Sequence, residues 1–325
     1  MDKQQKGKNF LVMDKAICLL CGSDQIEDLF QARDFRLNDH KETFKFVKCN
    51  KCNLIFQYPL PAEKDMIAHY NQNVLYKNPK DLSKLRQYLH NYGLKKRSEM
   101  ITHNKKQGLL LDIGCGTGSF LAYMAQHTHL EVTGTEINER NVAFIKNNYS
   151  FPVYLGDLQQ LAFPKEHFDV ITMWDVIEHL PNPKELLTEI HKILKPNGYL
   201  VIRVPNGNSF DFKLFGKYWA GVDAPRHYLI YTKQTLSVFL ENSGFSVVSG
   251  NSRIGSYFNF LTSLEFRLKD TKIKPKTRNF LLRTLSTTVV RAILFPIFWI
   301  KDLLTSGTSL TVIAKPNSNK STNDK

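Results

Sequence analysis

An apolar run followed by three glycines at alternate positions constrains this chain more than any other feature. Residues 109–113 form a mostly apolar stretch of strand length, and Gly114, Gly116 and Gly118 follow it. Residues 120–125 then have the apolar periodicity of a helix. Glycine tolerates a positive φ and carries no Cβ, so this strand–turn–helix segment lets a ligand approach backbone N–H groups.

Acidic residues and further apolar strands follow this turn in a regular order. Glu136 ends an alternating strand, where an acidic residue would meet ribose hydroxyls in a nucleotide-binding fold. Asp157 follows a third short strand, and residues 168–173 and 198–204 predict a fourth and a fifth. The G-x-G-x-G spacing differs from the G-x-G-x-x-G of dinucleotide-binding domains, which makes an NAD-binding Rossmann domain the weaker interpretation.

Together these segments resemble the class I S-adenosylmethionine-dependent methyltransferases. The resemblance covers residues 82–253, with a final strand near 308–315. It implies an α/β fold, in which a Rossmann-like seven-stranded sheet has helices on both faces. The motifs that carry it, in chain order, are Asp112 to Gly118, Glu136, Gly156-Asp157 and Leu194 to Tyr199.

The resemblance also implies how S-adenosylmethionine would be held. The 114–118 loop would lie against its methionine part, and Asp157 with Leu158 would frame the adenine. Glu136 would bind both ribose hydroxyls, and an ionised carboxylate suits a diol because it only accepts hydrogen bonds. The residues expected at the cofactor are Asp112, Gly114, Cys115, Gly116, Gly118, Glu136, Ile137, Asp157, Leu158 and Trp174.

Four of the five cysteines form two C-x-x-C pairs, Cys18 with Cys21 and Cys49 with Cys52. Two such pairs can supply the four thiolates of a tetrahedral, structural Zn²⁺ site. Residues 14–60 are therefore expected to form a zinc-ribbon-like module. Four buried thiols or two redox pairs are the alternatives. The fifth cysteine, in the glycine loop, is expected to be a small packing residue.

The net charge of +14, from 44 basic and 30 acidic residues, favours an anionic partner. Nucleic acid, a membrane surface or a phosphorylated substrate could each be this anionic partner. The Lys-rich start does not predict a secretory signal, and no apolar run reaches the roughly 18–20 residues of a membrane span. The chain is therefore expected in the cytoplasm, with or without peripheral contact with the inner face of the cell membrane.

The remaining sequence divides into helical segments and a core. Residues 61–107 have mostly helical patterns; in methyltransferases resembling this chain such helices cover the cofactor, and a packing scaffold is the alternative. The core is expected over residues 108–254 and 307–316. Residues 255–306 lie between the last two strands, and a connection of that length indicates a function.

This insertion, residues 255–306, is first basic and then apolar and aromatic. The pattern suits an interfacial anchor on anionic lipid, whereas Arg291 and Pro296 argue against a spanning helix. A helical hairpin packed on the core or on a second subunit is the alternative. The polar residues 316–325 are expected to be disordered.

The segment after the fourth strand carries titratable side chains at the edge where a ligand binds in an open α/β sheet. Asp175, Glu178 and His179 resemble the two acids and following histidine that bind a divalent cation in ubiquinone-type O-methyltransferases. The first of them is one methylene shorter than Glu. The alternative is that Glu178 braces the loop, with His179 as an acid/base candidate.

Pro225-Arg226-His227 follows an aromatic loop after the fifth strand and precedes a helix that begins at Thr232. A P-x-H element there resembles bacterial methyltransferases of polysaccharide and sugar-modifying pathways. We expect His227 to remove the acceptor proton and Arg226 to bind an anionic group such as phosphate. The alternative is that both residues brace the loop.

These features predict an S-adenosylmethionine-dependent enzyme that methylates oxygen or carbon of a sugar, nucleotide-sugar or lipid-linked intermediate of cell-surface polysaccharide synthesis. An RNA or protein methyltransferase is the second hypothesis, because zinc ribbons and basic charge serve there too. However, the fourth strand ends in Trp174-Asp175, not in the Asn-Pro-Pro-Tyr type of motif. A non-enzymatic zinc-binding adaptor is the third, and the intact Glu136 and Asp157 oppose it.

Overall fold

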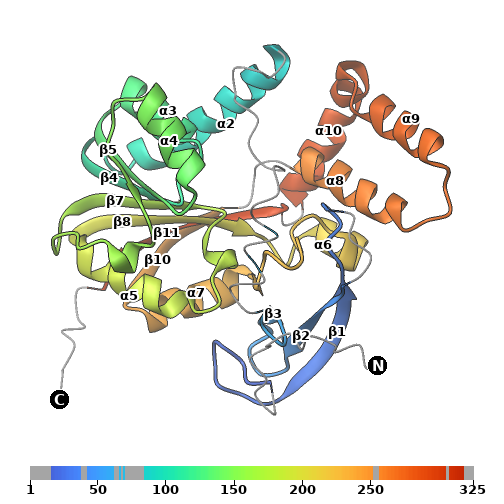
Figure 1. Cartoon of the computed structure of the whole chain (residues 1–325), viewed down its shortest axis with the longest axis horizontal. Helices are drawn as coiled ribbons and strands as arrows, with labels where there is room; N and C mark the ends of the chain where they lie inside the picture. The colour runs from blue at the N-terminus through green and yellow to red at the C-terminus, as the bar shows by residue number, and fades with distance from the viewer. Residues whose placement is uncertain are drawn as a thin grey trace, which may run out of the picture.

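A seven-stranded mixed sheet forms the centre of the molecule, in the order β10-β11-β8-β7-β4-β5-β6 (Figure 1). The five strands from β8 to β6 are parallel, and β11 runs antiparallel to both β8 and β10. This order confirms the predicted Rossmann-like sheet, including its late antiparallel strand. The strands are β4 (Gln107–Ile113), β5 (His129–Glu136), β6 (Val153–Leu155), β7 (Phe168–Trp174), β8 (Leu194–Pro205), β10 (Phe245–Asn251) and β11 (Ser309–Pro316).

The computed structural model describes residues 16–37, 42–61, 66, 69, 84–251, 256–304 and 307–317. Most of the predicted helical stretch before residue 84 therefore lies outside the described residues, although Met66 and His69 are helical. The predicted disordered tail lies outside them from residue 318 onward.

Helices cover both faces of the sheet, which explains why β7 is buried at every position. One face is covered by α2 (Lys84–Thr102), α3 (Ser119–His127) and α4 (Glu139–Asn148), and the other by α5 (Pro183–Ile193) and α7 (Lys233–Asn242) (Figure 1). Thr232 caps α7 as predicted: its hydroxyl accepts the N–H of Thr235, and the Thr235 hydroxyl accepts the backbone N–H of Thr232.

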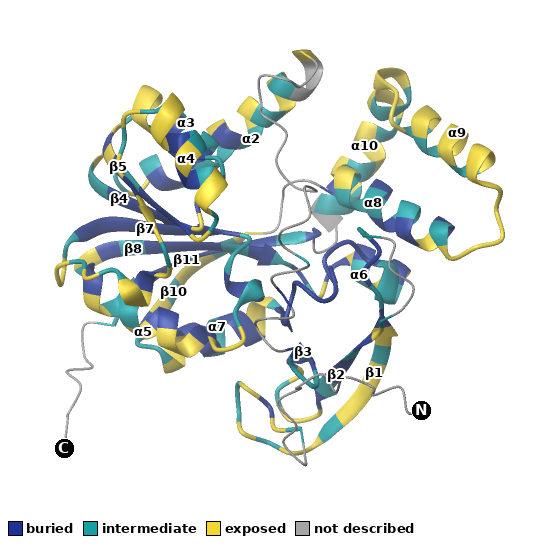
Figure 2. Cartoon of the chain, viewed as in Figure 1, coloured by how far each residue is buried: buried dark blue, intermediate teal, exposed yellow. Residues whose placement is uncertain are grey.

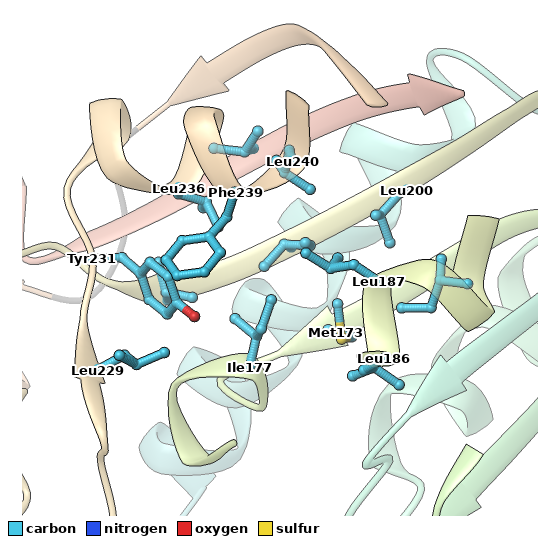
Figure 3. Close-up of a cluster of buried hydrophobic side chains, with 14 of the residues drawn as sticks. Met173, Ile177, Leu186, Leu187, Leu200, Leu229, Tyr231, Leu236, Phe239 and Leu240 are labelled. Carbon is cyan, nitrogen blue, oxygen red and sulfur yellow. The ribbon is translucent and has the colours of Figure 1, made fainter. Parts of the chain in front are cut away.

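The larger apolar cluster fills the space between the sheet and the helices α5 and α7 (Figure 3). Met173 and Leu200 project from the strands toward side chains of both helices. The Tyr231 ring packs edge-on against Phe239 at 5.7 Å between centroids. Tyr231 thereby ties the segment before α7 to the core.

A second sheet, in the order β1-β2-β3-β9, contains the N-terminal module. Its strands are β1 (Ile26–Ala32), β2 (Phe44–Cys49), β3 (Ile55–Gln57) and β9 (Leu229–Ile230). The last strand comes from the methyltransferase core: Phe56 pairs with Leu229 and Ile55 with Ile230. The module is therefore joined to the core by backbone hydrogen bonds immediately after His227.

The insertion between β10 and β11 is helical, as expected. It consists of α8 (Ser256–Lys269), α9 (Pro275–Leu285) and α10 (Thr288–Leu304), and α9 and α10 project from the body of the molecule (Figure 1). The short helix α6 (Phe210–Phe215), in the aromatic loop after β8, packs on α8 through Phe215 and Phe260, whose ring centroids are 5.2 Å apart.

Candidate active site and metal centre

The loop between β4 and α3 has the backbone that the glycine pattern predicts. Gly114, Gly116 and Gly118 all have positive φ values, of 66°, 57° and 73°. A Cβ at Gly114 would lie 2.8 Å from a methyl carbon of Val176, and one at Gly118 would lie 3.0 Å from Ile145. These positions therefore admit only glycine, both for backbone conformation and for space. The fifth cysteine, Cys115, is buried in this loop against β5, in agreement with a packing role.

Glu136, at the end of β5, faces this loop and is only 7% exposed. Its Oε2 accepts the N–H of Gly116 at 2.7 Å, and its Oε1 accepts the N–H of Asn138 at 2.9 Å. Burial raises the pKa of this carboxyl, although the backbone hydrogen bonds favour the charged form. A carboxylate only accepts hydrogen bonds, so Glu136 has the chemistry to bind a diol, with the N–H of Ile137 and the Asn141 side chain as further donors beside it.

The other predicted adenosine contacts lie beside Glu136. Leu155 of β6 pairs with Glu136, which brings Asp157 to the same edge of the sheet. Asp157 and Ile137 are exposed, whereas Leu158 is buried. The structure therefore brings together the buried carboxylate of Glu136, the exposed carboxylate of Asp157 and the apolar side chain of Leu158, which suit the ribose and adenine of an adenosine group.

Trp174 ends β7 next to the glycine loop and packs edge-on against Phe120 at 5.2 Å. Its indole N–H is buried and has no hydrogen-bond partner among the described residues. Asp112 lies nearby at the end of β4, where its Oδ1 accepts from the Thr172 hydroxyl at 2.6 Å, and burial raises its pKa to about 7. An unpaired donor and a buried acid beside a glycine cradle fit a bound polar ligand.

Arg97 of α2 belongs to this part of the site, and our sequence analysis missed it. Its guanidinium stacks on Trp174, 4.9 Å from the ring centroid. Burial, and then repulsion from Arg203, lowers its pKa to about 9. The signal was present in the sequence, because Arg97 is spaced between Leu94 and Ile101 on the apolar stripe of a helix, where a cation calls for an explanation.

Asp175 does not join the acidic group in which it was expected. Its side chain forms a two-point ion pair with Arg203 of β8, with Nε 3.0 Å from Oδ1 and a second contact between Nη2 and Oδ2. Its φ of 59° turns the side chain away from the helical path of the following residues. The predicted cation set of Asp175, Glu178 and His179 is therefore not assembled in this form.

Glu178, His179 and His227 do come together, each bringing one potential ligand atom to within 4.8 Å of the others. Glu178 is fully buried, and neither of its carboxylate oxygens has a hydrogen-bond partner among the described residues. Burial, and then the nearby Asp175, raise its pKa well above the usual range. The divalent cation stays a prediction, with His227 in place of Asp175 as the third side chain.

His227 is oriented by backbone and carboxylate groups. Its Nδ1 lies 2.9 Å from the carbonyl oxygen of Gly221, and since a carbonyl only accepts, Nδ1 carries the proton in the neutral ring. Its Nε2 lies 4.0 Å from Glu178 Oε1 and 3.9 Å from Asp223 Oδ2. Burial lowers the pKa of His227, so the ring is neutral at neutral pH and its Nε2 lone pair can accept a proton. His179 packs beside it, and burial lowers its pKa to about 3.

Arg226 is a buried brace, with 3% of its side chain exposed. It donates two hydrogen bonds to Asp34, at 2.7 and 2.9 Å, and one to Asp223 at 2.8 Å. Burial opposes ionisation of Asp34, but hydrogen bonds from His69 and Arg226 outweigh it and hold the pKa of Asp34 at about 2. These contacts favour the bracing alternative for Arg226 over direct binding of an anionic acceptor.

The four cysteines of the N-terminal module converge as predicted. Sγ of Cys18 lies 3.4 Å from that of Cys52, Sγ of Cys21 lies 3.6 Å from that of Cys49, and all four lie within 4.8 Å of one another. A tetrahedral zinc–thiolate site has sulfur–sulfur distances of roughly 3.8 Å. The four sulfurs therefore fit a closed, structural Zn²⁺ site.

The two halves of this cysteine site share one backbone design. The residue after each pair, Gly22 or Asn53, has a left-handed φ, of 69° or 62°. Its N–H donates to the carbonyl of the first cysteine of its pair, Cys18 or Cys49, at 2.9 Å. Each pair is thus held in a tight turn that points both thiols to one side. The left-handed conformation explains why Gly and Asn, which tolerate it, occupy these positions.

Comparison with known proteins identifies a family for the larger part of the chain. The sequence profile of the family described as "Methyltransferase domain" matches residues 84–250. Phosphoethanolamine N-methyltransferase 3 of Arabidopsis thaliana is 28% identical over 163 residues, which are 47% of this chain and 31% of that protein. The ubiquinone biosynthesis O-methyltransferase of Coxiella burnetii is 29% identical over 104 residues, 30% of this chain and 44% of that protein.

The chain thus spans less than half the length of these curated relatives. Among solved structures, an S-adenosylmethionine-dependent methyltransferase from Archaeoglobus fulgidus matches with a TM-score of 0.48 and 25% sequence identity, covering 71% of this chain and 97% of that one.

Proposed function

This chain belongs to the family of proteins with a methyltransferase domain, and on that basis we propose that it is an S-adenosylmethionine-dependent O-methyltransferase of small-molecule acceptors. The acceptor class that we propose is a sugar, nucleotide-sugar or lipid-linked intermediate of cell-surface polysaccharide synthesis. The observation that carries O-methylation is His227, whose basic nitrogen faces two buried carboxylates on the acceptor side of the sheet.

Different residues around the glycine loop are suited to bind different parts of the cofactor. Glu136 is suited to accept from the ribose hydroxyls, and Asp157 with Leu158 to border the adenine. Arg97 lies next to Trp174 and Asp112, whereas Arg203, which also lies over the Trp174 ring, is paired with Asp175. Arg97 is therefore suited to hold the carboxylate of the methionine part. When bound, S-adenosylmethionine supplies a methyl group on a positively charged sulfur, which is already an activated donor.

With an activated donor, the chain mainly has to align the acceptor and take its proton. His227 is suited to receive a hydroxyl proton at Nε2, because Gly221 fixes its tautomer. The imidazolium that forms would be stabilised by Asp223, whose pKa is lowered by Arg36 and Arg226 even though burial raises it. Arg226 thus acts on the reaction through Asp223, as a positioning residue.

We expect His227→Ala to lower the turnover number at least about 10²-fold while cofactor affinity stays unchanged, since general-base catalysis typically contributes that much. Because burial lowers the pKa of His227, the wild-type rate should fall as the pH drops below 6.5 through that lowered pKa. In the His227→Ala variant the rate should no longer show this fall at low pH. The measurement is a pH–rate profile with labelled methyl donor, next to cofactor binding by calorimetry.

The acceptor for this assay would be found with the same labelled donor, offered to free sugars, nucleotide-sugars and lipid-linked saccharides. His127→Ala is the matched control, because that histidine is exposed on α3 away from the acceptor side. Unchanged turnover in His227→Ala would remove the base role. Labelling of RNA or protein, with no labelling of any saccharide, would overturn the proposed acceptor class.

A separate prediction concerns the cofactor. Glu136→Gln should weaken S-adenosylmethionine binding by about 10- to 100-fold, because the amide loses the charge of the carboxylate and one of its two acceptor oxygens. Calorimetric titration measures it. Glu139→Gln, an exposed acid three residues later in the first turn of α4, is the matched control and should bind as the wild type does. Equal affinity of the Glu136 variant and the wild type would contradict the assignment.

A further inference from the structure

The outer side of the α9–α10 hairpin is an apolar surface that nothing in the described structure covers. Phe280 of α9 is 74% exposed and Trp299 of α10 is 56% exposed. On α10 every fully exposed position between residues 289 and 300 is apolar (Figure 2). We call this surface the hairpin apolar face, and its large members are Phe280, Leu281, Val289, Ile293, Phe295, Ile297, Trp299 and Ile300.

We propose that the hairpin apolar face docks on the surface of an anionic lipid bilayer. The proposal rests on the exposure and charge of the hairpin and is independent of which acceptor is methylated. A soluble protein rarely leaves so many large apolar side chains of one helical hairpin exposed, so a partner that removes them from water is expected.

The hairpin is held in place from its inner side, so its outer side is not exposed by poor packing. Phe298 packs edge-on against Tyr257 and Phe260 of α8, with ring centroids 4.9 and 5.1 Å away. Lys301 forms an ion pair with the buried Asp211 of α6 at 2.9 Å. The inner positions of α10 are therefore already used by the fold, which leaves the remaining positions to face a partner.

The charge of the hairpin identifies that partner as anionic. Residues 271–301 contain seven basic residues and no acidic one. Lys301 and Arg291 lie on the inner side of α10. The other cations are exposed or half-buried on the α8–α9 loop and on α9: Lys272, Lys274, Lys276, Arg278 and Arg283. A second copy of the chain would present the same cations and repel them. Anionic lipid headgroups attract clustered cations beside an apolar face.

The geometry favours an interfacial position over a transmembrane one. No single helix in the described ranges is long and apolar enough to cross a bilayer, and α9 and α10 reach that threshold only as a pair bent by 70°. The inner side of α10 packs on α8, so lipid cannot surround it. Trp299 and Phe295 are side chains suited to the headgroup boundary. The hairpin would thus lie in the plane of the interface.

This position would also orient the rest of the enzyme. The base of the hairpin, α8, packs on α6, which belongs to the loop on the acceptor side of the sheet (Figure 1). Docking of the hairpin apolar face would therefore bring that loop close to the bilayer, as an acceptor held in a membrane requires.

The test is flotation of the full-length protein with vesicles of phosphatidylcholine alone or of an equal mixture with phosphatidylglycerol. We expect the wild type to float with the mixed vesicles. The triple variant Phe280→Ser, Ile293→Ser, Trp299→Ser should bind them at least about tenfold more weakly, because three large apolar side chains lose their insertion. These side chains are exposed, so the variant should keep the wild-type fold and cofactor binding.

A control variant replaces exposed apolar residues on other surfaces, with Leu29→Ser, Tyr88→Ser and Val248→Ser, and should float as the wild type does. Tryptophan emission gives a second readout, since Trp174 and Trp219 are buried and Trp299 is exposed. A blue shift on adding mixed vesicles that Trp299→Phe abolishes would support docking through this face.

The remaining outcomes would overturn the proposal. Absence of wild-type flotation would remove the membrane as partner, and a dimer in solution broken by the triple serine variant would assign the face to a second copy. Equal binding of neutral and mixed vesicles would remove the role of the cations. Equal binding by the triple serine variant and the wild type would show that the hairpin apolar face is not the docking surface.

Discussion

Replacing Arg226 by methionine is expected to destabilise the protein by about 3–5 kcal/mol, the usual cost of leaving a buried ion pair without one partner. Arg226 connects Asp34, in the loop after β1, to Asp223, just before the site histidine. Its removal takes one cation from each of two buried carboxylates, which keep Arg36 beside Asp223 and His69 beside Asp34. The measurement is the free energy of unfolding in urea, with the cofactor absent so that binding does not mask the loss.

A rescue experiment and a pH series distinguish this mechanism from simple loss of packing. Adding Asp34→Asn and Asp223→Asn to the Arg226 variant should recover part of the stability, because neutral amides are cheaper to bury. The folded-state pKa values of Asp34 and Asp223 are lowered, so their pairing contributes fully above pH ~4 and is lost as the pH falls through those values. The Arg226 variant should show a weaker acid dependence, because Arg36 still pairs with Asp223 and His69 with Asp34. An Arg226 variant as stable as the wild type at neutral pH would contradict the assignment.

The ion-pair network around Arg226 could not be predicted from the sequence. Asp34 and Arg226 are 192 residues apart, and no local pattern relates them. The same holds for β9, two residues long, which becomes a strand only because β3 offers it unpaired backbone groups. Each feature depends on how the module docks on the core, so neither propensity nor spacing can reveal it.

Features with local causes were predictable. The glycine loop needs positive φ values at fixed positions, and the central strands alternate with helices at the spacing of βαβ units, so the sequence alone indicated both the order of elements and the nucleotide-binding edge. The cysteine pairs likewise carry their geometry within a few residues. Asp175 departs from the prediction because Arg203, on a neighbouring strand, competes for its carboxylate.

The largest loss of stability is expected from a substitution in the cysteine site. In Cys49→Ser one ligand of the proposed zinc site is lost, and the metal should dissociate from the purified protein. Binding of structural zinc to cysteine turns is worth about 10–16 kcal/mol in small domains, which is as large as the usual stability of a whole domain. Strands β1 to β3 should therefore lose their fixed structure. Metal content by mass spectrometry and hydrogen exchange of the β2 and β3 amides measure the two effects.

The loss of structure should extend beyond the module, because β3 is the strand that pairs with β9 in this sheet of the described residues. Amides of residues 229–230 should exchange faster, and the cofactor loop, which belongs to the other sheet, should keep its protection and its affinity. Cys115→Ser is the matched control: it removes a buried thiol outside the cysteine quartet and should retain one zinc per chain. A wild-type protein without zinc, or a Cys49 variant that keeps the metal and its protected strands, would refute the structural role of the site.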